Sequence, residues 1–444
     1  MPAIFTEKYR VFLAKTLVAQ FAANTTIMYA FMGRVLPWAA PTAPPTPVDN
    51  TQDTDYGYWH DMLGAKRVTD IQFVVPRFDW VAHTVFTQYD DQSGTLFSSQ
   101  YYALDTTTLP FKVYKCLWNN KGAESTVAPS VIGTALNPTQ TADGYVWQYM
   151  YTINDATGRL FLTSQWMPVV VDPTMQANAL ANPGKLPIAV PLIITTPGSG
   201  YNPGINTTVT LVGDGTNANI TSNSVHIVGG ALDSVVFNVG GNNYTELSVN
   251  VYQSGVVQGS VRPIIPPYPN HAYDPVKELN ATAIMMVTSF ANNETNKLTV
   301  SNDYRQIGLI VNPLLANGAP ATATYYKQTT DVTFSANTGI FNPDDAVVNK
   351  TNPAAPYATV VDVVSNTVMR LTSVHTNGVA TPFANGDVLK CYASGAEATV
   401  ASVSAPELKP YSGDIVLVMN RTAITRGAIQ TEQIKLIFPF NADA

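Results

Sequence analysis

Charged side chains are scarce in this sequence. Asp, Glu, Lys and Arg make up 12% of its 444 residues, roughly half the share of an average soluble domain. Such a composition is expected where much of the surface contacts other subunits, because the centres of protein interfaces are depleted in charge. A soluble all-β protein that works alone accounts for the same composition equally well.

Basic residues are too few and too scattered to bind nucleic acid or an anionic membrane. The net charge is −7, the isoelectric point is about 5.2, and no run of Lys or Arg occurs. A nucleic-acid groove needs a basic stripe that meets phosphates, so we expect no nucleic-acid partner. An anionic membrane surface is an equally poor partner.

Long apolar runs are also missing. No stretch reaches about 18 uninterrupted apolar residues, so no helix is expected to span a membrane. The first segment, from Met1 to Phe21, carries scattered charges and lacks the apolar centre and cleavage site of a signal peptide. The sequence therefore predicts a cytosolic protein.

Cysteine and histidine do not form a recognisable metal site. Cys116 and Cys391 are too few for a disulfide framework or a zinc site, and we interpret them as buried free thiols rather than a bridge. None of the histidines belongs to a His-Glu-x-x-His or His-x-His motif. The five isolated histidines are His60, His83, His226, His271 and His375. We expect neither a metal site nor a cofactor.

No motif for catalysis is present either. The sequence has no Gly-x-Ser-x-Gly elbow and no phosphate-binding Gly-x4-Gly-Lys-Ser/Thr loop. The Gly-rich stretches GSGYNPG and GDG precede no helical pattern, so they predict β turns. A glycoside hydrolase needs two carboxylates that face each other at about 5–10 Å. The pairs Asp53/Asp55, Asp90–Asp91 and Asp344–Asp345 are instead interpreted as solvated turn residues, and no enzyme activity is predicted.

The residues that are abundant indicate a β protein. The chain has 28 glycines and 31 prolines, and these residues, with Asn, make the corners between strands rich in β-branched residues. A first helix is predicted with a cap at Thr6 and a stop at Asn24. Its apolar residues recur at helical spacing and are Tyr9, Phe12, Leu13, Leu17 and Phe21.

Two further segments before residue 70 have a predicted structure. A short helix is predicted over 56–66. Five prolines between Pro37 and Pro47 predict a stiff, extended loop that cannot join a sheet. This loop either lies along a neighbour or is a plain connector.

Strands are predicted over 27–32, from Asp70 to Pro76, and in the stretches FKVYKCLWNN and DGYVWQYMYTI. The last stretch places five large residues on one face, which we interpret as a core wall rather than an aromatic sugar platform. The opposite face, with Val146, Met150 and Thr152, is expected to be a poor core. The five large residues are Tyr145, Trp147, Tyr149, Tyr151 and Ile153.

Two pairs of internal repeats predict two small β domains set into the main fold. In the first pair Gly198 corresponds to Gly241 and Tyr201 to Tyr244, each followed by a strand. Two copies are too few for a solenoid, so we expect one inserted β domain over 191–265.

The second pair of repeats predicts the other inserted domain. Phe341 corresponds to Phe383, Asp345 to Asp387, and the stretch ATVVDV to the stretch ATVASV. We expect the second inserted β domain over 320–409.

The last residues carry a resemblance to a known family. The tail reads GDIVLVMNRTAITRGAIQTEQIKLIFPF and is similar to the C-terminus of the baseplate wedge subunits of contractile-tailed, T-even-like bacteriophages, the family of the wedge protein numbered eight. That family ends in a strand, an Asn-Arg turn followed by Ile, a Gln-Thr-Glu and a final strand. The matching residues are Asn420, Arg421, Ile424, Gln430, Thr431, Glu432 and 434–438.

Other stretches resemble the same family in the same order. They are MGRVLPW (with Gly33, Arg34, Pro37 and Trp38), VVPRFDW (with Pro76, Arg77, Asp79 and Trp80), VYKCLWN, DGYVWQYMYTI, HAYDPVKELNA and YRQIGLIVNP (with Arg305). The resemblance covers about 1–190, 262–319 and 410–444. The chain is longer than the T-even protein, chiefly in the two predicted inserts.

The resemblance implies a mainly β fold with a layered β-sandwich core, formed by 1–190 with 262–319 and 410–444, and a few short helices in loops. It also implies a homodimer in the virion, assembled in the host cytoplasm, that links other baseplate wedge proteins and takes part in the conformational change on infection. No enzyme activity and no cofactor are implied. The candidates for fixing loops or meeting partners are Arg34, Trp38, Arg77, Trp80, Arg305, Arg421, Arg426 and Glu432.

Two other classes remain open. A glycan-binding adhesin of the tail tip is suggested by the small β inserts and the many tyrosines, and saturable binding to host polysaccharide would favour it. A virion-bound glycan hydrolase would release sugar, but no pair of carboxylates in the sequence is expected to converge.

Overall fold

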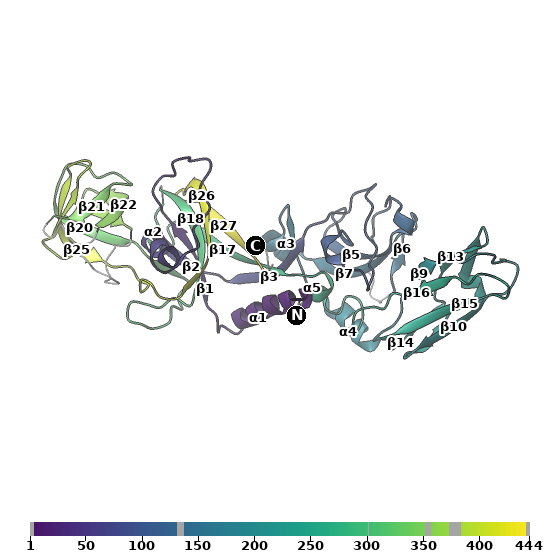
Figure 1. The fold of residues 1–444 in the computed structure, drawn as a ribbon. Helices are drawn as coiled ribbons and strands as arrows, with labels where there is room; N and C mark the ends of the chain where they lie inside the picture. Colours follow the sequence, from purple (N-terminus) through teal and green to yellow (C-terminus); the bar gives the residue numbers. More distant parts are fainter. Residues whose placement is uncertain (1–3, 131–136, 301, 351–356, 373–382, 441–444) are drawn as a thin grey trace. The chain divides into compact units, whose positions relative to one another are not determined.

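The computed structural model describes residues 4–440 apart from 131–136, 301, 351–356 and 373–382. Strands dominate these residues and helices are few (Figure 1), so the predicted mainly β class is confirmed. The chain divides into two compact units. Unit 1 comprises residues up to 15, 72–285 and from 437 on, and unit 2 comprises 16–71 and 286–436. No helix in the described part of the chain is long and apolar enough to cross a membrane.

The first predicted helix is confirmed as α1 (Glu7–Ala22). The Thr6 hydroxyl accepts a hydrogen bond from the backbone N–H of Tyr9 at 3.3 Å, and Asn24 has a φ of 53°, which ends the helix. The buried side differs from the predicted one. Val11 is 2% exposed, whereas Phe12 is 60% exposed.

Unit 2 contains a five-stranded sheet. Its order is β19-β2-β1-β18-β26, with β19 (Tyr325–Lys327), β2 (Met62–Arg67), β1 (Met28–Gly33), β18 (Asp303–Val311) and β26 (Asp414–Thr425). The predicted helix over 56–66 is wrong in its second half. A π-helical turn (η1, Asp53–Gly57) and α2 (Tyr58–Asp61) are helical, but the chain then enters β2, which pairs with β1 and β19. These long-range backbone hydrogen bonds outweigh the local helical spacing.

The Pro-rich loop contacts strand β26 of the same chain. The indole N–H of Trp38 donates to the backbone oxygen of Arg421 at 2.7 Å. The Asn420 side-chain amide donates to the backbone oxygen of Pro45 at 3.0 Å. The loop therefore lies along a strand of its own sheet, and its predicted role of lying along a neighbour stays a prediction.

Unit 2 also holds a closed barrel with the strand order β20-β23-β22-β21-β24-β25. Its strands are β20 (Thr330–Thr338), β21 (Ala346–Asn349), β22 (Tyr357–Ser365), β23 (Val368–Leu371), β24 (Val388–Cys391) and β25 (Glu397–Ser404). The two sequence repeats adopt the same local structure. Asp345 and Asp387 each accept a hydrogen bond at 2.8 Å from the backbone N–H three residues before them. Phe341 and Phe383 are both buried in the barrel core.

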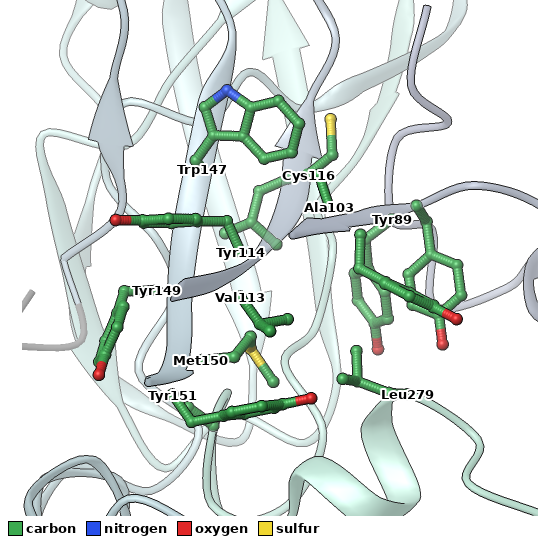
Figure 2. Close-up of a cluster of buried hydrophobic side chains, with 14 of the residues drawn as sticks. Tyr89, Ala103, Val113, Tyr114, Cys116, Trp147, Tyr149, Met150, Tyr151 and Leu279 are labelled. Carbon is green, nitrogen blue, oxygen red and sulfur yellow. The ribbon is translucent and has the colours of Figure 1, made fainter. Parts of the chain in front are cut away.

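The main core of unit 1 surrounds a sheet of order β4-β5-β7-β6. The strands are β4 (Tyr102–Asp105), β5 (Phe111–Trp118), β7 (Val146–Ile153) and β6 (Thr139–Gln140). Figure 2 shows Tyr114, Trp147 and Tyr151 of these strands in one cluster with Leu279. The predicted core wall is confirmed.

The expectation that the other face of β7 is a poor core is wrong. Val146, Gln148 and Met150 are at most 1% exposed. The same core cluster contains Met175 and Leu279, which lie far along the chain. Local alternation in β7 does not reveal such distant cover, so only the folded chain shows that both faces of the strand are buried.

Besides the strands of residues 186–265, the described part of the chain contains one further sheet, three further helices and three 3-10 turns. A sheet of order β27-β17-β3-β8 is formed by β27 (Thr431–Pro439), β17 (Ala283–Ala291), β3 (Asp70–Pro76) and β8 (Trp166–Pro168). The helices are α3 (Asp155–Phe161), α4 (Pro173–Ala181) and α5 (Pro275–Glu278), with 3-10 turns η2 (Leu96–Ser98), η3 (Asn120–Gly122) and η4 (Ser222–Ser224). The strand predicted to stop at Pro76 is confirmed as β3.

A second hydrophobic core of unit 1 belongs to residues 186–265. Its sheets have the orders β10-β15-β16-β9, β11-β14 and β12-β13. The strands are β9 (Ile193–Thr196), β10 (Thr208–Gly213), β11 (Thr216–Asn219), β12 (Val225–Val228), β13 (Ala231–Val235), β14 (Val239–Asn242), β15 (Leu247–Tyr252) and β16 (Ser260–Arg262).

The first pair of sequence repeats also forms equivalent structures. Gly198 and Gly241 have φ angles of 68° and 58°, and Tyr201 and Tyr244 are buried. A Cβ on either glycine would lie 2.8–2.9 Å from the ring of the Tyr three residues later, so both features require glycine. The division of the whole chain into a sandwich core and two inserted domains stays a prediction.

Candidate functional site

Arg34, a residue of the MGRVLPW stretch, lies in a buried ion cluster of unit 2. It is 3% exposed, and it pairs with the carboxylates of Asp303 and Asp344. It also donates to the backbone oxygen of Asp303 at 2.8 Å and to the Asn302 side chain at 2.5 Å. These contacts tie the segment after β1 to the start of β18.

Arg305 completes this cluster. Its guanidinium contacts the Asp303 carboxylate at 2.6 Å and donates to the backbone oxygen of Val35 at 2.7 Å. Two arginines therefore share two carboxylates. Burial lowers the pKa of Arg34, the Asp344 carboxylate opposes this shift, and Arg305 adds to it. The charges balance, so the cluster stabilises the local backbone.

Arg426 and Glu432 join the two sides of the final turn. Arg426 is 3% exposed. Its Nε lies 3.0 Å from the Glu432 carboxylate, and its two terminal nitrogens donate to the backbone oxygens of Thr299 and Asn292 at 3.0 and 2.6 Å. Burial first, and then the Glu432 charge, raise the pKa of Tyr304 to about 12. Arg426 thus holds the turn and the segment after β17 in one position.

Arg77 and Trp80 fix a loop of unit 1. Arg77 makes a two-pronged contact with Asp79 at 2.7 and 2.9 Å and donates to the backbone oxygen of Thr163 at 2.8 Å. The Trp80 indole donates to the Ser125 hydroxyl at 3.0 Å. Both side chains are part of internal networks.

Arg421 differs from the other candidates. Its side chain is exposed and contacts only the sulfur of Met419, at 3.4 Å, among the hydrogen bonds of the described residues. Of the eight predicted residues, Arg421 is therefore the side chain best placed to reach a partner. Arg34, Arg305, Arg426 and Glu432 contact the protein's own backbone or charges.

A buried charged cluster in unit 1 was not among the predicted site residues. Lys115 of β5 is fully buried and pairs with Glu278 of α5, while its Nζ lies 2.7 Å from Nδ1 of His271. The ring of Tyr89 lies below the ammonium, 4.2 Å from Nζ to the ring centroid. Nε2 of His271 has no hydrogen-bond partner in the part of the chain that the structure describes.

The electrostatics of this cluster favour one charge pair and a neutral imidazole. Burial, and then the Lys115 charge, lower the pKa of His271 to about 4. Burial opposes ionisation of Glu278, but Lys115 and His271 together hold the pKa of this carboxyl below its usual value. At neutral pH the cluster therefore contains an ammonium, a carboxylate and an uncharged His271.

A sequence signal for this cluster existed. Lys115 interrupts the run of apolar residues from Val113 to Leu117, and the stretch HAYDPVKELNA contains both His271 and Glu278. Nothing in the local spacing, however, brings β5 beside α5. The predicted isolation of His271 was wrong for this reason.

The other titratable residues form separate pairs. Asp90 and Asp91 lie in a turn, as predicted, but both contact Arg262 at 2.7 Å and are therefore paired with a cation as well as partly solvated. Within the described residues no group of three or more His, Cys, Asp or Glu could hold a metal ion. Both cysteines are buried and free, as predicted. His375 lies outside the described residues.

No protein-family model matches this chain, and no curated protein matches it. The resemblance to baseplate wedge subunits therefore stays a prediction from the sequence.

Proposed function

We propose that this chain is a structural subunit of the baseplate wedge of a contractile-tailed bacteriophage. It would be made in the host cytoplasm and assembled into the virion as a homodimer that links other wedge proteins. Its work would be mechanical, in baseplate assembly and in the change of shape on infection. The proposal includes no enzyme activity, cofactor, nucleic acid or membrane.

One observation carries the proposal: stretches that resemble the family, far apart in sequence, contact each other within each unit. In unit 1, Lys115 of VYKCLWN pairs with Glu278 of HAYDPVKELNA. In unit 2, Trp38 of MGRVLPW bonds to Arg421 of the tail. Chance similarities scattered along a chain have no reason to be mutual partners, so these contacts support a shared scaffold.

The surface supports an assembly role more generally. Phe5, Tyr9 and Phe12 near the start of the chain are 73%, 45% and 60% exposed, and their rings contact one another. Aromatic residues are enriched and charged residues depleted in the centres of protein interfaces. The low charge of the chain agrees with this composition.

The first test is the mass of the purified full chain by light scattering. A value near twice 47.9 kDa supports the dimeric subunit, and a trimer contradicts it. The second test uses an antibody raised against the chain on purified phage particles in the electron microscope, with pre-immune antibody as the control. Label at the baseplate supports the proposal, and label confined to the capsid or fibres overturns it.

A further inference from the structure

A pocket lies within unit 1, where the main core meets residues 186–265. Its volume is about 570 Å³, which falls in the range of small-molecule sites. Four parts of the chain line it: the segment before η2, the end of β5 with η3, strand β9, and β13. The lining residues include Thr87, Gln88, Asp90, Trp118, Lys121 and Asp233.

The lining combines one aromatic ring and an aliphatic strand with planar polar groups. Trp118 is partly buried at the end of β5, and Ile193 and Ile194 come from β9. Gln88 and Trp118 make no side-chain hydrogen bond within the described residues. Their amide and indole N–H groups are therefore available to a ligand that also offers an apolar face.

The charges in the pocket are already balanced. Asp90 accepts two hydrogen bonds from Arg262, at 2.7 and 2.8 Å. Asp233 pairs with Lys121 at 2.5 Å. Because each carboxylate has its own cation, a charged ligand would have to break an ion pair. A neutral ligand could instead donate hydrogen bonds to carboxylate oxygens that the ion pairs already hold in position.

The loop that carries Lys121 is held in an uncommon backbone conformation. Asn120, Lys121 and Gly122 have φ angles of 50°, 60° and 82°. The Asn119 side chain accepts from the N–H of Gly122 at 3.1 Å, and the Asn120 amide donates to the backbone oxygen of Asp143 at 3.0 Å. Non-glycine residues in this region of φ are strained and gather at functional sites. The loop is thus fixed at the rim of the pocket.

We propose that this pocket binds a neutral saccharide. A sugar ring has an apolar C–H face that would stack on Trp118, and hydroxyl groups that would bond to Gln88 and to the oriented carboxylates. The proposal does not rest on the wedge role, because it concerns a site formed by other residues. In a phage particle such a site would contact glycans of the host surface.

The experiment is saturation-transfer NMR on the full chain. The probes are glucose, galactose, mannose, N-acetylglucosamine and their disaccharides, with glucuronic acid as the acidic comparison. We expect saturable binding of at least one neutral sugar with a dissociation constant on the order of 1 mM. No saturation up to about 50 mM with any neutral probe, or a preference for glucuronic acid, overturns the proposal.

Variants locate the binding. Thr87 is exposed and lines the pocket, and Thr87→Trp introduces a large ring that should compete with a ligand for this space, so binding should be lost. Gln88→Ala should weaken binding about fivefold. Gln92→Ala, an exposed amide outside the pocket, is the matched control and should bind like the wild type. Unchanged binding in Thr87→Trp, with an unchanged circular dichroism spectrum, would show that the site lies elsewhere and overturn the proposal.

Discussion

Loss of the Glu278 carboxylate should strongly destabilise unit 1. The Lys115 side chain is 0% exposed and the Glu278 side chain is 3% exposed. His271 cannot replace the lost carboxylate, because an imidazole is either neutral or positively charged and supplies no negative charge beside Lys115. In the substitution Glu278→Leu the Lys115 ammonium is therefore left without a carboxylate partner among the described residues.

The magnitude follows from the burial of Lys115. Removing one partner of a buried ion pair costs about 3–5 kcal/mol. Deprotonation of Lys115 sets an upper limit on this cost. Deprotonating an amine with a pKa of 10.5 at pH 7 costs about 5 kcal/mol. If burying the unpaired ammonium costs more than this, Lys115 loses its proton instead. We expect Glu278→Leu to lower the free energy of unfolding of unit 1 by about 4 kcal/mol.

The double variant Lys115→Met with Glu278→Leu separates the charge effect from the packing effect. It removes both charges, so its stability should lie within about 1 kcal/mol of the wild type. Arg159→Met is the matched control for a lost ion pair. Arg159 and Asp155 are 78% and 77% exposed, so loss of this solvent-screened pair should leave the stability close to that of the wild type.

The measurement is hydrogen exchange of peptides from β5 and β7 at increasing urea concentrations. A local readout is needed because the two units need not unfold together. A loss below about 1 kcal/mol in Glu278→Leu would refute the reasoning. A double variant that is no more stable than Glu278→Leu alone would refute it as well, since the coupling between the charges would then be absent.

Three further outcomes are expected. The pKa of His271 is 6.5 in the unfolded chain and about 4 in the folded chain. Between these two pH values the unfolded chain binds more protons, so the free energy of unfolding of unit 1 should fall by about 3 kcal/mol as the pH falls through this window. His271→Asn should remove this loss in the same exchange assay, and an unchanged dependence on pH would contradict the assignment. Arg426→Ala should cost unit 2 about 3 kcal/mol because it leaves the Glu432 carboxylate without its cation and two backbone carbonyls without a donor. The exposed Arg421→Ala should stay within about 0.5 kcal/mol. Equal urea midpoints for the two variants would argue against the buried network. Gly308→Ala should lower the free energy of unfolding by about 2–3 kcal/mol, because the new Cβ would lie 2.2 Å from the Phe31 ring on β1. In the control Gly94→Ala the Cβ meets nothing within 4 Å, so this variant should melt near the wild-type temperature. An unchanged stability of Gly308→Ala would show that the sheet adjusts easily to the added methyl group.

Local sequence patterns were sufficient to predict several elements of the structure. Helix α1 begins and ends at the residues its capping signals predicted, because a cap acts within four residues of the chain. The two Gly-x-x-Tyr and the two Phe-x3-Asp repeats also formed equivalent turns. Their hydrogen bonds and ring contacts lie within a few residues, so they form wherever the sequence recurs.

The sequence by itself determined the mainly β class, the buried thiols and the repeated turns, since these depend on short-range spacing and composition. Only the tertiary structure decided that Met62 begins a strand instead of extending a helix, and that both faces of β7 are buried. It also decided that Lys115 meets Glu278, 163 residues later. Such contacts depend on which distant segments of the chain pack together. A buried charge is stable only where this packing brings an opposite charge beside it.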